Sequence, residues 1–238
     1  MIRDAIILMA GTGSRLRSQA RTTAKPLIPI GGRPLISYAI QSFAKVGVKT
    51  LHSIVGPNGD ELAAAMAPLL PPQMCLNAIA NPNWQKQNGV SLLCAEGKVR
   101  APFFLAMGDH LFEHSILEQL AARADLTRLN LAIDRKIDSV FDLDDAMKVQ
   151  TRDNKITRIG KNLASYDAID TGIFLCPEMI FDFLRLALAN DDCSLADGVR
   201  LMAAEGKVCA IDIGSARWQD VDTPEMLAHA ELLAGHWH

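Results

Sequence analysis

The strongest constraint on the fold is a repeating order of short apolar runs and longer amphipathic segments. The first run, residues 5–10, contains only Ala, Ile, Leu and Met, as expected of a strand buried on both faces of a sheet. Residues 34–46 follow with apolar side chains three and four positions apart, which is the period of a helix. Strands that alternate with helices form parallel sheets covered on both faces, so this order predicts an α/β fold.

The same two patterns recur along the chain. Further strands are predicted at residues 48–55, 74–80, 102–107, 129–134, 146–151, 155–159, 168–176 and 208–213. Further helices are predicted at residues 59–69, 88–99, 115–124, 178–189, 195–205 and 224–233. Between 129 and 176 the strands follow one another with little helix, and Arg152-Asp-Asn154 is typical of a hairpin turn. We therefore expect a doubly wound, mostly parallel sheet with an antiparallel accessory sheet or lid.

No repeat, low-complexity segment or linker interrupts this order. We expect a single domain over residues 1–238, with a core from about 1–125 and 170–235 and accessory strands from about 129–170.

Composition excludes several classes of protein. Hydrophobic residues make up 49% of the 238 residues and the formal net charge is −3, which is too apolar and too weakly charged for a disordered chain. A slightly acidic balance disfavours nucleic-acid binding, which needs a basic surface. No apolar run approaches the roughly 18 residues of a membrane span, and the N-terminus has no signal-peptide pattern. We expect a protein without a membrane span or a nucleic-acid partner.

Cysteine usage points to a reducing compartment. Five cysteines stand at positions 75, 94, 176, 193 and 209, with no C-x-x-C pair. An odd number of cysteines, most of them in apolar segments, predicts thiols and not a disulfide framework or a zinc site, so we expect a cytoplasmic location.

A polar, glycine-containing loop follows the first predicted strand, at the sheet edge where open α/β proteins bind ligands. It contains Gly11-Thr-Gly-Ser-Arg15, and Lys25-Pro26 follows ten residues later. Glycines let backbone N–H groups approach a phosphate, and Arg15 and Lys25 add positive charge. Leu16 stands where G-x-G-x-x-G needs its third glycine, and Pro26 follows Lys25 where a Walker A loop needs Ser or Thr. The loop is therefore predicted to bind phosphate in neither of these two ways.

The segment Leu8-Met-Ala-Gly-Thr-Gly-Ser-Arg-Leu16, with Lys25-Pro-Leu-Ile-Pro-Ile-Gly-Gly-Arg-Pro-Leu35, resembles the signature of the nucleotidyltransferases that make nucleotide sugars and CDP-alcohols. The resemblance implies a Rossmann-like sheet and a reaction that joins a phosphorylated sugar or alcohol to an NTP and releases pyrophosphate. It implies that Arg15 and Lys25 are catalytic. It also implies that the nucleotide phosphates are held by Ala10, Gly11, Thr12, Gly13 and Ser14.

Downstream segments are similar to those of CTP:inositol-1-phosphate cytidylyltransferases. They are Asn88-Gly-Val-Ser-Leu-Leu93, Met107-Gly-Asp-His110, Lys148-Val149, Ile159-Gly-Lys-Asn-Leu163 and Asp170-Thr-Gly172. The resemblance implies CTP and inositol-1-phosphate as substrates and CDP-inositol as product. Family members are often fused to a membrane-embedded transferase, whereas a free-standing form is expected here.

Three other functions stay open. Bacterial phosphocholine cytidylyltransferases resemble the same segments, and a sugar-1-phosphate nucleotidyltransferase would use another NTP. A catalytically silent nucleotide-binding regulatory subunit would share the fold without the reaction. The family commonly forms oligomers, so a homo-oligomer is possible.

Two acids are candidates for a Mg²⁺ site, since Mg²⁺ takes one or two carboxylates together with substrate phosphates. Asp109 comes directly after a predicted buried strand, at the edge where ligands bind. The resemblance implies a second acid near Trp218, where Asp222 fits best and Asp220 is the alternative. Thr223, just before Pro224, is expected to cap the last helix.

One further possible metal-binding pattern is interpreted as a chance match. His110-Leu-Phe-Glu-His114 fits a zinc-peptidase motif, but that motif needs one continuous helix and this segment begins at the end of a strand.

The remaining candidates concern the base and the acceptor. Asn88, Gly89 and Ser91 are expected to contact the base, although Asn88 could instead cap a helix. For the acceptor, the candidates are Lys148, Lys161, Asp170, Thr171 and Gly172. The lysines would hold its phosphate and Asp170 its hydroxyls, although the lysines could equally lie on a solvated strand face and Gly172 in a bulge.

Overall fold

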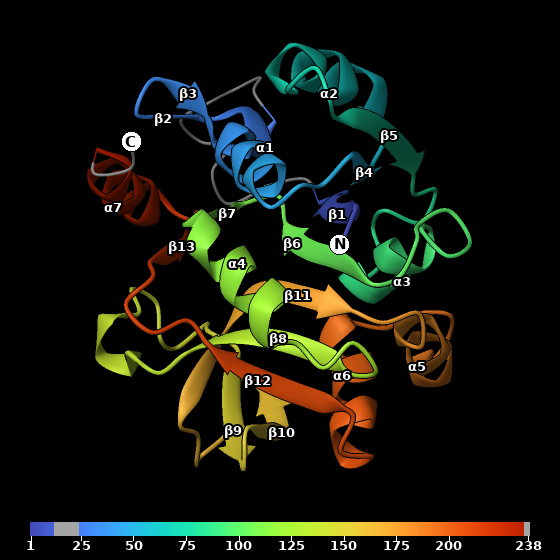
Figure 1. The fold of residues 1–238 in the computed structure, drawn as a ribbon, viewed down its shortest axis with the longest axis vertical. Helices are drawn as coiled ribbons and strands as arrows, with labels where there is room; N and C mark the ends of the chain where they lie inside the picture. The colour runs from blue at the N-terminus through green and yellow to red at the C-terminus, as the bar shows by residue number, and fades with distance from the viewer. Residues whose placement is uncertain (12–23, 236–238) are drawn as a thin grey trace.

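The computed structural model describes residues 1–11 and 24–235. Nine strands of this part of the chain form one sheet: β1 (Asp4–Met9), β4 (Thr50–Val55), β5 (Cys75–Ala80), β6 (Phe103–Met107), β8 (Leu129–Asp134), β9 (Lys148–Arg152), β10 (Lys155–Gly160), β11 (Ala168–Cys176) and β12 (Val208–Asp212). Their order is β5-β4-β1-β6-β11-β8-β12-β10-β9 (Figure 1). The bounds agree closely with the strands predicted from the apolar runs.

The sheet is mixed. Strands β5, β4, β1 and β6 are parallel neighbours, as the alternation with helices predicts. β11 is antiparallel to both β6 and β8, and β8 is parallel to β12. β8 therefore lies within the main sheet, whereas the sequence placed it among the accessory strands. The hairpin of β9 and β10 extends the same sheet at its far end, and its turn residues Asp153 and Asn154 have φ of 51° and 58°, which confirms the predicted hairpin.

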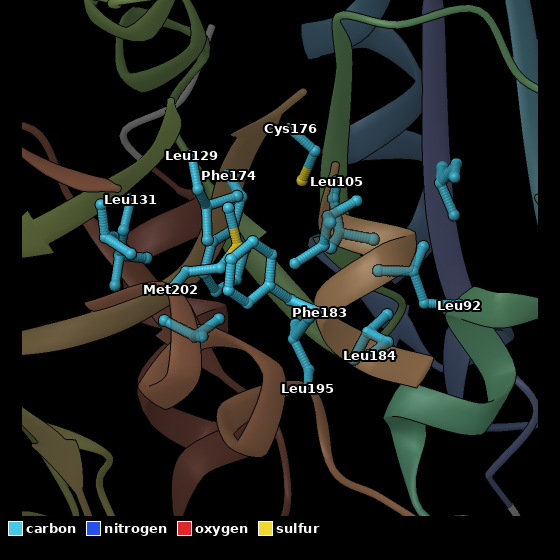
Figure 2. Packing of buried hydrophobic residues seen from close by; sticks show 14 of the residues in the cluster. Leu92, Leu105, Leu129, Leu131, Phe174, Cys176, Phe183, Leu184, Leu195 and Met202 are labelled. Carbon is cyan, nitrogen blue, oxygen red and sulfur yellow. The ribbon is translucent and has the colours of Figure 1, made fainter. Parts of the chain in front are cut away.

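Helices cover the two faces of the sheet. One face is covered by α1 (Leu35–Lys45), α2 (Gly59–Met66) and α4 (His114–Arg123), and the other by α3 (Asn88–Leu93), α5 (Ile180–Ala187) and α6 (Leu195–Ala204). Alternate residues of β1 enter the two cores, with Ile7 on the first side and Ile6 on the second. Figure 2 shows Phe174 of β11 and Leu131 of β8 packed with side chains of α5 and α6. These two apolar layers fix the sheet edge that carries the site.

The structure adds short elements that the periodicity did not predict. They are β2 (Pro29–Ile30), β3 (Arg33–Pro34), β7 (His110–Phe112), β13 (Trp218–Asp220) and the 3₁₀ turns η1 (Lys25–Leu27), η2 (Ala67–Leu69) and η3 (Ile137–Ser139). β7 pairs antiparallel with β13, which puts Asp220 opposite His110. α3 ends at Leu93 and not at residue 99, because the chain turns there and Gly97 takes φ of +70°.

The last helix, α7 (Pro224–Ala234), packs over β2, β7 and Val221, which follows β13, in a third apolar cluster. Thr223 accepts a hydrogen bond from the backbone N–H of Met226 at 3.2 Å, which confirms the predicted cap. The neighbouring Asp222 side chain is therefore not needed as the cap.

The sequence also led us to expect free thiols and no membrane-spanning helix. All five cysteines are free thiols in the structure. Among the helices of the described residues, none is long and apolar enough to cross a bilayer.

The aromatic cluster around Phe43 provides a test of this packing. Phe43 of α1 is fully buried, and its ring lies 6.1 Å from the rings of both Phe104 and Phe112. We expect Phe43→Ala to lower the free energy of unfolding by about 3–5 kcal/mol in urea titrations, because it removes a large buried side chain. Leu186→Ala is the control, because Leu186 is 72% exposed and the expected change is within about 0.5 kcal/mol. Equal losses for the two variants would contradict this description of the core.

Candidate active site

A cavity of about 580 Å³ opens at the carboxyl ends of the parallel strands β1 and β6. Ala10 and Gly11 line it where β1 ends, and Asp109 lines it beyond β6. The loop candidates Thr12, Gly13, Ser14 and Arg15 lie outside the described residues. From other parts of the chain the cavity is also lined by Lys25, Lys86, Asn88, Ser91, His110, Lys161 and Asp222. Of the sequence candidates that the structure describes, Ala10 and Gly11, Lys25 and the two acids Asp109 and Asp222 therefore meet at one place.

Lys25 lies between the two predicted metal ligands. Its Nζ donates to Oδ2 of Asp109 at 2.7 Å and to Oδ1 of Asp222. Lys25 begins η1, Asp109 follows β6, and Asp222 lies between β13 and α7. The backbone N–H of Val221 donates to the carbonyl of Asp109 at 3.0 Å, so the segment before α7 is attached directly to the turn after β6.

Charge compensation fixes the protonation states in this group. Burial alone would raise the pKa of Asp109, but His110 and Lys25 outweigh burial and hold it well below its usual range. Burial alone would lower the pKa of Lys25, but the carboxylates of Asp109 and Asp222 raise it. Asp109 is therefore a carboxylate and Lys25 an ammonium ion at neutral pH.

The same group fits a magnesium ion. Two carboxylates already converge on one cation, the Lys25 ammonium, and carboxylate oxygens are ligands that Mg²⁺ prefers. Residues 1–11 and 24–235 contain no group of three or more His, Cys, Asp or Glu arranged to hold a metal. Two protein carboxylates are enough for Mg²⁺ when substrate phosphates and water complete its shell.

His110 is a site residue that the sequence analysis did not select. Its Nδ1–H donates to Oδ1 of Asp109 at 2.7 Å, and its ring stacks on Trp218 with centroids 5.9 Å apart. The indole N–H of Trp218 in turn donates to Oδ2 of the buried Asp134 at 2.9 Å. Burial alone would lower the pKa of His110, but the hydrogen bond and charge of Asp109, together with the charge of Asp220, raise it. The available signal was the pair Asp109-His110 directly after a buried strand.

The zinc-peptidase pattern is not formed on one helix. His110 lies in β7, whereas His114 begins α4.

Gly172 is required by the position of His110. It has φ of +72°, and a Cβ there would lie 2.6 Å from Nε2 of His110. The pairing of β11 with β8 shifts register between Asp170 and Phe174, so this glycine does lie at an irregularity of the strand. Gly172 thus allows β11 to pass directly beneath the histidine ring.

Asp170 and Thr171 face different surroundings. Burial raises the pKa of Asp170 to about 6, although the N–H of Gly172, which donates to its Oδ1 at 2.7 Å, and the charge of His110 act in the opposite direction. Thr171 is fully buried, and its hydroxyl donates to the carbonyl of Ala132 in the neighbouring strand β8 at 2.8 Å. Its side chain lines neither cavity.

A second, smaller cavity of about 220 Å³ adjoins the first, larger one. The two cavities share three lining residues, Asn88, Met107 and His110. The described lining of the second cavity has no lysine or arginine but four acids: Asp142, Asp145, Asp170 and Asp220. Burial and the nearby carboxylates of Asp222 and Asp109 raise the pKa of Asp220, against the effect of His110.

The two acceptor lysines occupy different places. Nζ of the buried Lys148 donates to the carbonyls of Leu143 at 2.8 Å and of Lys161 at 2.9 Å, and Lys148 lines neither cavity. Lys161 lines the first cavity and forms an ion pair with Asp145. Lys86, which the sequence analysis did not select, also lines the first cavity and donates to the carbonyl of Asp191 at 2.8 Å.

Of the three residues expected to contact the base, two line the first cavity and one does not. Asn88 and Ser91 line the first cavity, and the Ser91 hydroxyl accepts a hydrogen bond from Asn81 at 2.9 Å. Gly89 does not line it, because it packs against Cys193, whose carbonyl would be 2.7 Å from an added Cβ. The N-cap of α3 is Gln87, so Asn88 is not the cap of its own helix.

Comparisons with solved structures support the fold. The inositol-1-phosphate CTP transferase from T. maritima has a TM-score of 0.87 and 28% sequence identity, over 98% of this chain and 95% of that chain. A putative glucose-1-phosphate thymidylyltransferase from Bacillus anthracis has a TM-score of 0.84 at 19% identity, over 100% and 97% of the two chains, and shows the fold alone. The Rossmann-like nucleotidyltransferase fold implied by the sequence is confirmed.

Sequence comparisons agree. The bifunctional IPC transferase and DIPP synthase of Aquifex aeolicus is 30% identical over 234 residues, which are 97% of this chain and 51% of that protein. The protein of the same description from Thermococcus kodakarensis is 33% identical over 233 residues, or 96% and 50%. The chain thus spans about half the length of these curated relatives. Residues 5–137, more than half of the chain, match the family model of the MobA-like NTP transferase domain. The protein therefore belongs to the MobA-like NTP transferases and is a nucleotidyltransferase related to the IPC transferases.

Proposed function

We propose that this protein is a cytidylyltransferase that joins CTP and inositol-1-phosphate to give CDP-inositol and pyrophosphate. The observation that carries the proposal is the convergence of Lys25, Asp109 and Asp222 on one point of the larger cavity, beside the end of β1. The choice of substrates is supported by the similarity, over nearly the whole chain, to the inositol-1-phosphate CTP transferase from T. maritima.

The reaction requires placement and charge neutralisation more than proton transfer. An oxygen of the acceptor phosphate attacks the α-phosphorus of CTP, the bond from that phosphorus to the oxygen of the β-phosphate breaks, and pyrophosphate leaves. The attacking phosphate is already ionised at neutral pH, because its second pKa is about 6. No Ser, Cys or His nucleophile is needed, and transfer depends on alignment and electrostatic stabilisation.

Each member of the charged group has a defined part in this proposal. Asp109 and Asp222 would hold Mg²⁺, which when bound neutralises the triphosphate and polarises the α-phosphate. Lys25 supplies a fixed positive charge to the departing pyrophosphate, with Arg15 expected to act beside it. His110 binds Oδ1 of Asp109 and leaves Oδ2 directed at the Lys25 ammonium.

The smaller cavity is suited to the body of the acceptor. Carboxylates accept hydrogen bonds from hydroxyl groups, and inositol carries hydroxyls around its whole ring. Asp170 of β11 lines this cavity, and its ionised carboxylate can only accept hydrogen bonds. Asp145 and Asp220 line the same space.

Phosphocholine is the second candidate acceptor, and the same acidic lining favours it. A trimethylammonium group would be attracted by the carboxylates of Asp142, Asp145 and Asp170. Two aromatic residues line this cavity, but Trp218 already stacks on His110 and Phe174 is packed into the core, so neither ring is open to such a cation. Inositol-1-phosphate is therefore placed first.

A substrate panel tests the proposed function. Pyrophosphate release is measured with each of the four NTPs against inositol-1-phosphate, phosphocholine and glucose-1-phosphate in the presence of Mg²⁺. We expect release with CTP and inositol-1-phosphate. Release with another pair would assign that substrate instead, and no release with any pair would favour the silent regulatory subunit.

The acidic pair is tested by isosteric amides. We expect Asp109→Asn and Asp222→Asn each to lower kcat by at least about 10²-fold, because each removes a carboxylate proposed to hold the Mg²⁺ that stabilises the reacting phosphates. Asp220→Asn is the matched comparison, and its loss should be smaller, since Lys25 contacts Asp222 and not Asp220. Circular dichroism checks that all three variants fold. A larger loss of kcat for Asp220→Asn than for Asp222→Asn would make Asp220, and not Asp222, the second proposed magnesium ligand.

The raised pKa of Asp170 predicts a pH dependence. Above about pH 6 Asp170 is ionised and accepts hydrogen bonds from hydroxyls, whereas below this pH it gains a proton. We expect the KM for inositol-1-phosphate to rise as the pH falls from 7 to 5. The acceptor phosphate titrates in the same range, so Asp170→Asn serves as the control that retains only that contribution. Identical pH profiles of KM for wild type and Asp170→Asn would contradict the role of Asp170.

A further inference from the structure

The side-chain amide of Asn88 has a defined orientation. Asn88 is the first residue of α3, and its Oδ1 accepts a hydrogen bond from the backbone N–H of Leu195, the first residue of α6, at 2.8 Å. A backbone N–H can only donate, so the amide oxygen must face Leu195. The NH₂ group of Asn88 therefore points away from α6.

Neighbouring contacts hold Asn88 in place. The N–H of Gln87 donates to Oδ1 of Asp192 at 2.9 Å, and the N–H of Gly89 donates to the carbonyl of Cys193 at 3.1 Å. Three successive residues are thus attached to the segment 192–195. This segment is itself fixed, because Ser194 and Asp197 form a reciprocal capping box at the start of α6.

Asn88 lies where the two cavities meet. Asn88 lines both cavities, together with Met107 and His110. Within residues 1–11 and 24–235, Asn88 makes its side-chain hydrogen bond through Oδ1, and Nδ2 donates to no protein atom. Its two N–H donors are therefore available to a ligand that occupies the junction.

We propose that Asn88 is a catalytic residue, whose Nδ2 donates a hydrogen bond to a phosphate oxygen at the junction of the two substrates. The inference rests on the proposed function, in which the larger cavity holds the nucleotide and the smaller one holds the acceptor. The α-phosphate and the acceptor phosphate must then meet beside Asn88, since bond formation needs the reacting atoms roughly 3–3.5 Å apart. A neutral donor at this point aligns a phosphate oxygen without making the attacking oxygen less basic, as a cation would. This role differs from the base contact suggested by the sequence.

The variant Asn88→Asp distinguishes two features of this residue: the tether, which is the hydrogen bond from the N–H of Leu195 to Oδ1, and the donor, which is the NH₂ group. Aspartate has nearly the same shape and keeps an oxygen for the N–H of Leu195, but it replaces the NH₂ group by a second oxygen that repels phosphate. We expect an unchanged unfolding midpoint and a kcat lowered by at least about 10²-fold, the scale of losing one preorganised donor to a reacting phosphate. The preference for CTP over UTP should not change, because the base is not involved.

Two further variants complete the test. Asp192→Asn keeps an oxygen for the N–H of Gln87 but changes a charge outside both cavities, so its kcat should stay within about twofold of wild type. Asn88→Ala removes both the tether and the donor, and its kcat should fall as far as that of Asn88→Asp. If Asn88→Asp keeps the wild-type kcat while Asn88→Ala loses it, Asn88 acts through the tether alone and the inference is overturned.

Other outcomes also decide between the hypotheses. A changed CTP:UTP preference with an unchanged kcat in Asn88→Asp would overturn the inference and return Asn88 to the base. A wild-type protein that releases no pyrophosphate with any substrate pair would instead contradict the proposed function, and the role of Asn88 would fail with it.

Discussion

The site depends on one ionic interaction, in which the ammonium of Lys25 is shared by two carboxylates. Asp109 and Asp222 stand 84 and 197 residues from Lys25 in the sequence, and two carboxylates at such close quarters would repel each other without a cation. Their meeting is imposed by the backbone, through the pairing of β7 with β13 and the hydrogen bond from Val221 to Asp109. The low pKa of Asp109 and the raised pKa of Lys25 are the electrostatic result. A divalent cation would find the same two carboxylates already directed at one point.

Around this ion pair, side chains act mainly by positioning one another. Asp134 holds Trp218, Trp218 stacks on His110, and His110 binds one oxygen of Asp109. Gly172 leaves room for this arrangement, because a Cβ at its position would overlap the His110 ring. A change at Asp134 or Gly172 would therefore act on Asp109 through His110, although neither residue lines the larger cavity.

The sequence predicted the long elements because they carry a period, and it missed those that are too short to have one. The strands around Ile6 and Leu105 follow from apolar runs, whereas the three-residue strands β7 and β13 have no detectable pattern, yet they assemble the site. Asp109 was predicted at the sheet edge from its position after a buried strand, and the resemblance added Lys25 and Asp222. The structure brings the three side chains together, but their catalytic and metal roles stay predictions. The positive charge of Lys148 did not reveal which way its side chain points, and its ammonium group donates to backbone carbonyls instead of lining either cavity. The contacts of Asn88 and Gly89 with residues 192–195 could not be predicted either, because they join segments that are far apart in the sequence.

The two cavities differ in charge, and this difference sets how the substrates would lie. Lys25, Lys86 and Lys161 line the larger cavity, whereas the described lining of the smaller one carries four acids and no lysine or arginine. A net charge of −3 conceals this separation, because it sums over both regions. In the proposed reaction a triphosphate is stable only beside the lysines, and the acceptor phosphate is repelled by the acids of its own cavity. In this proposal the acceptor enters with its hydroxyls toward Asp170 and its phosphate toward Asn88 and His110, which brings that phosphate to the junction with the larger cavity.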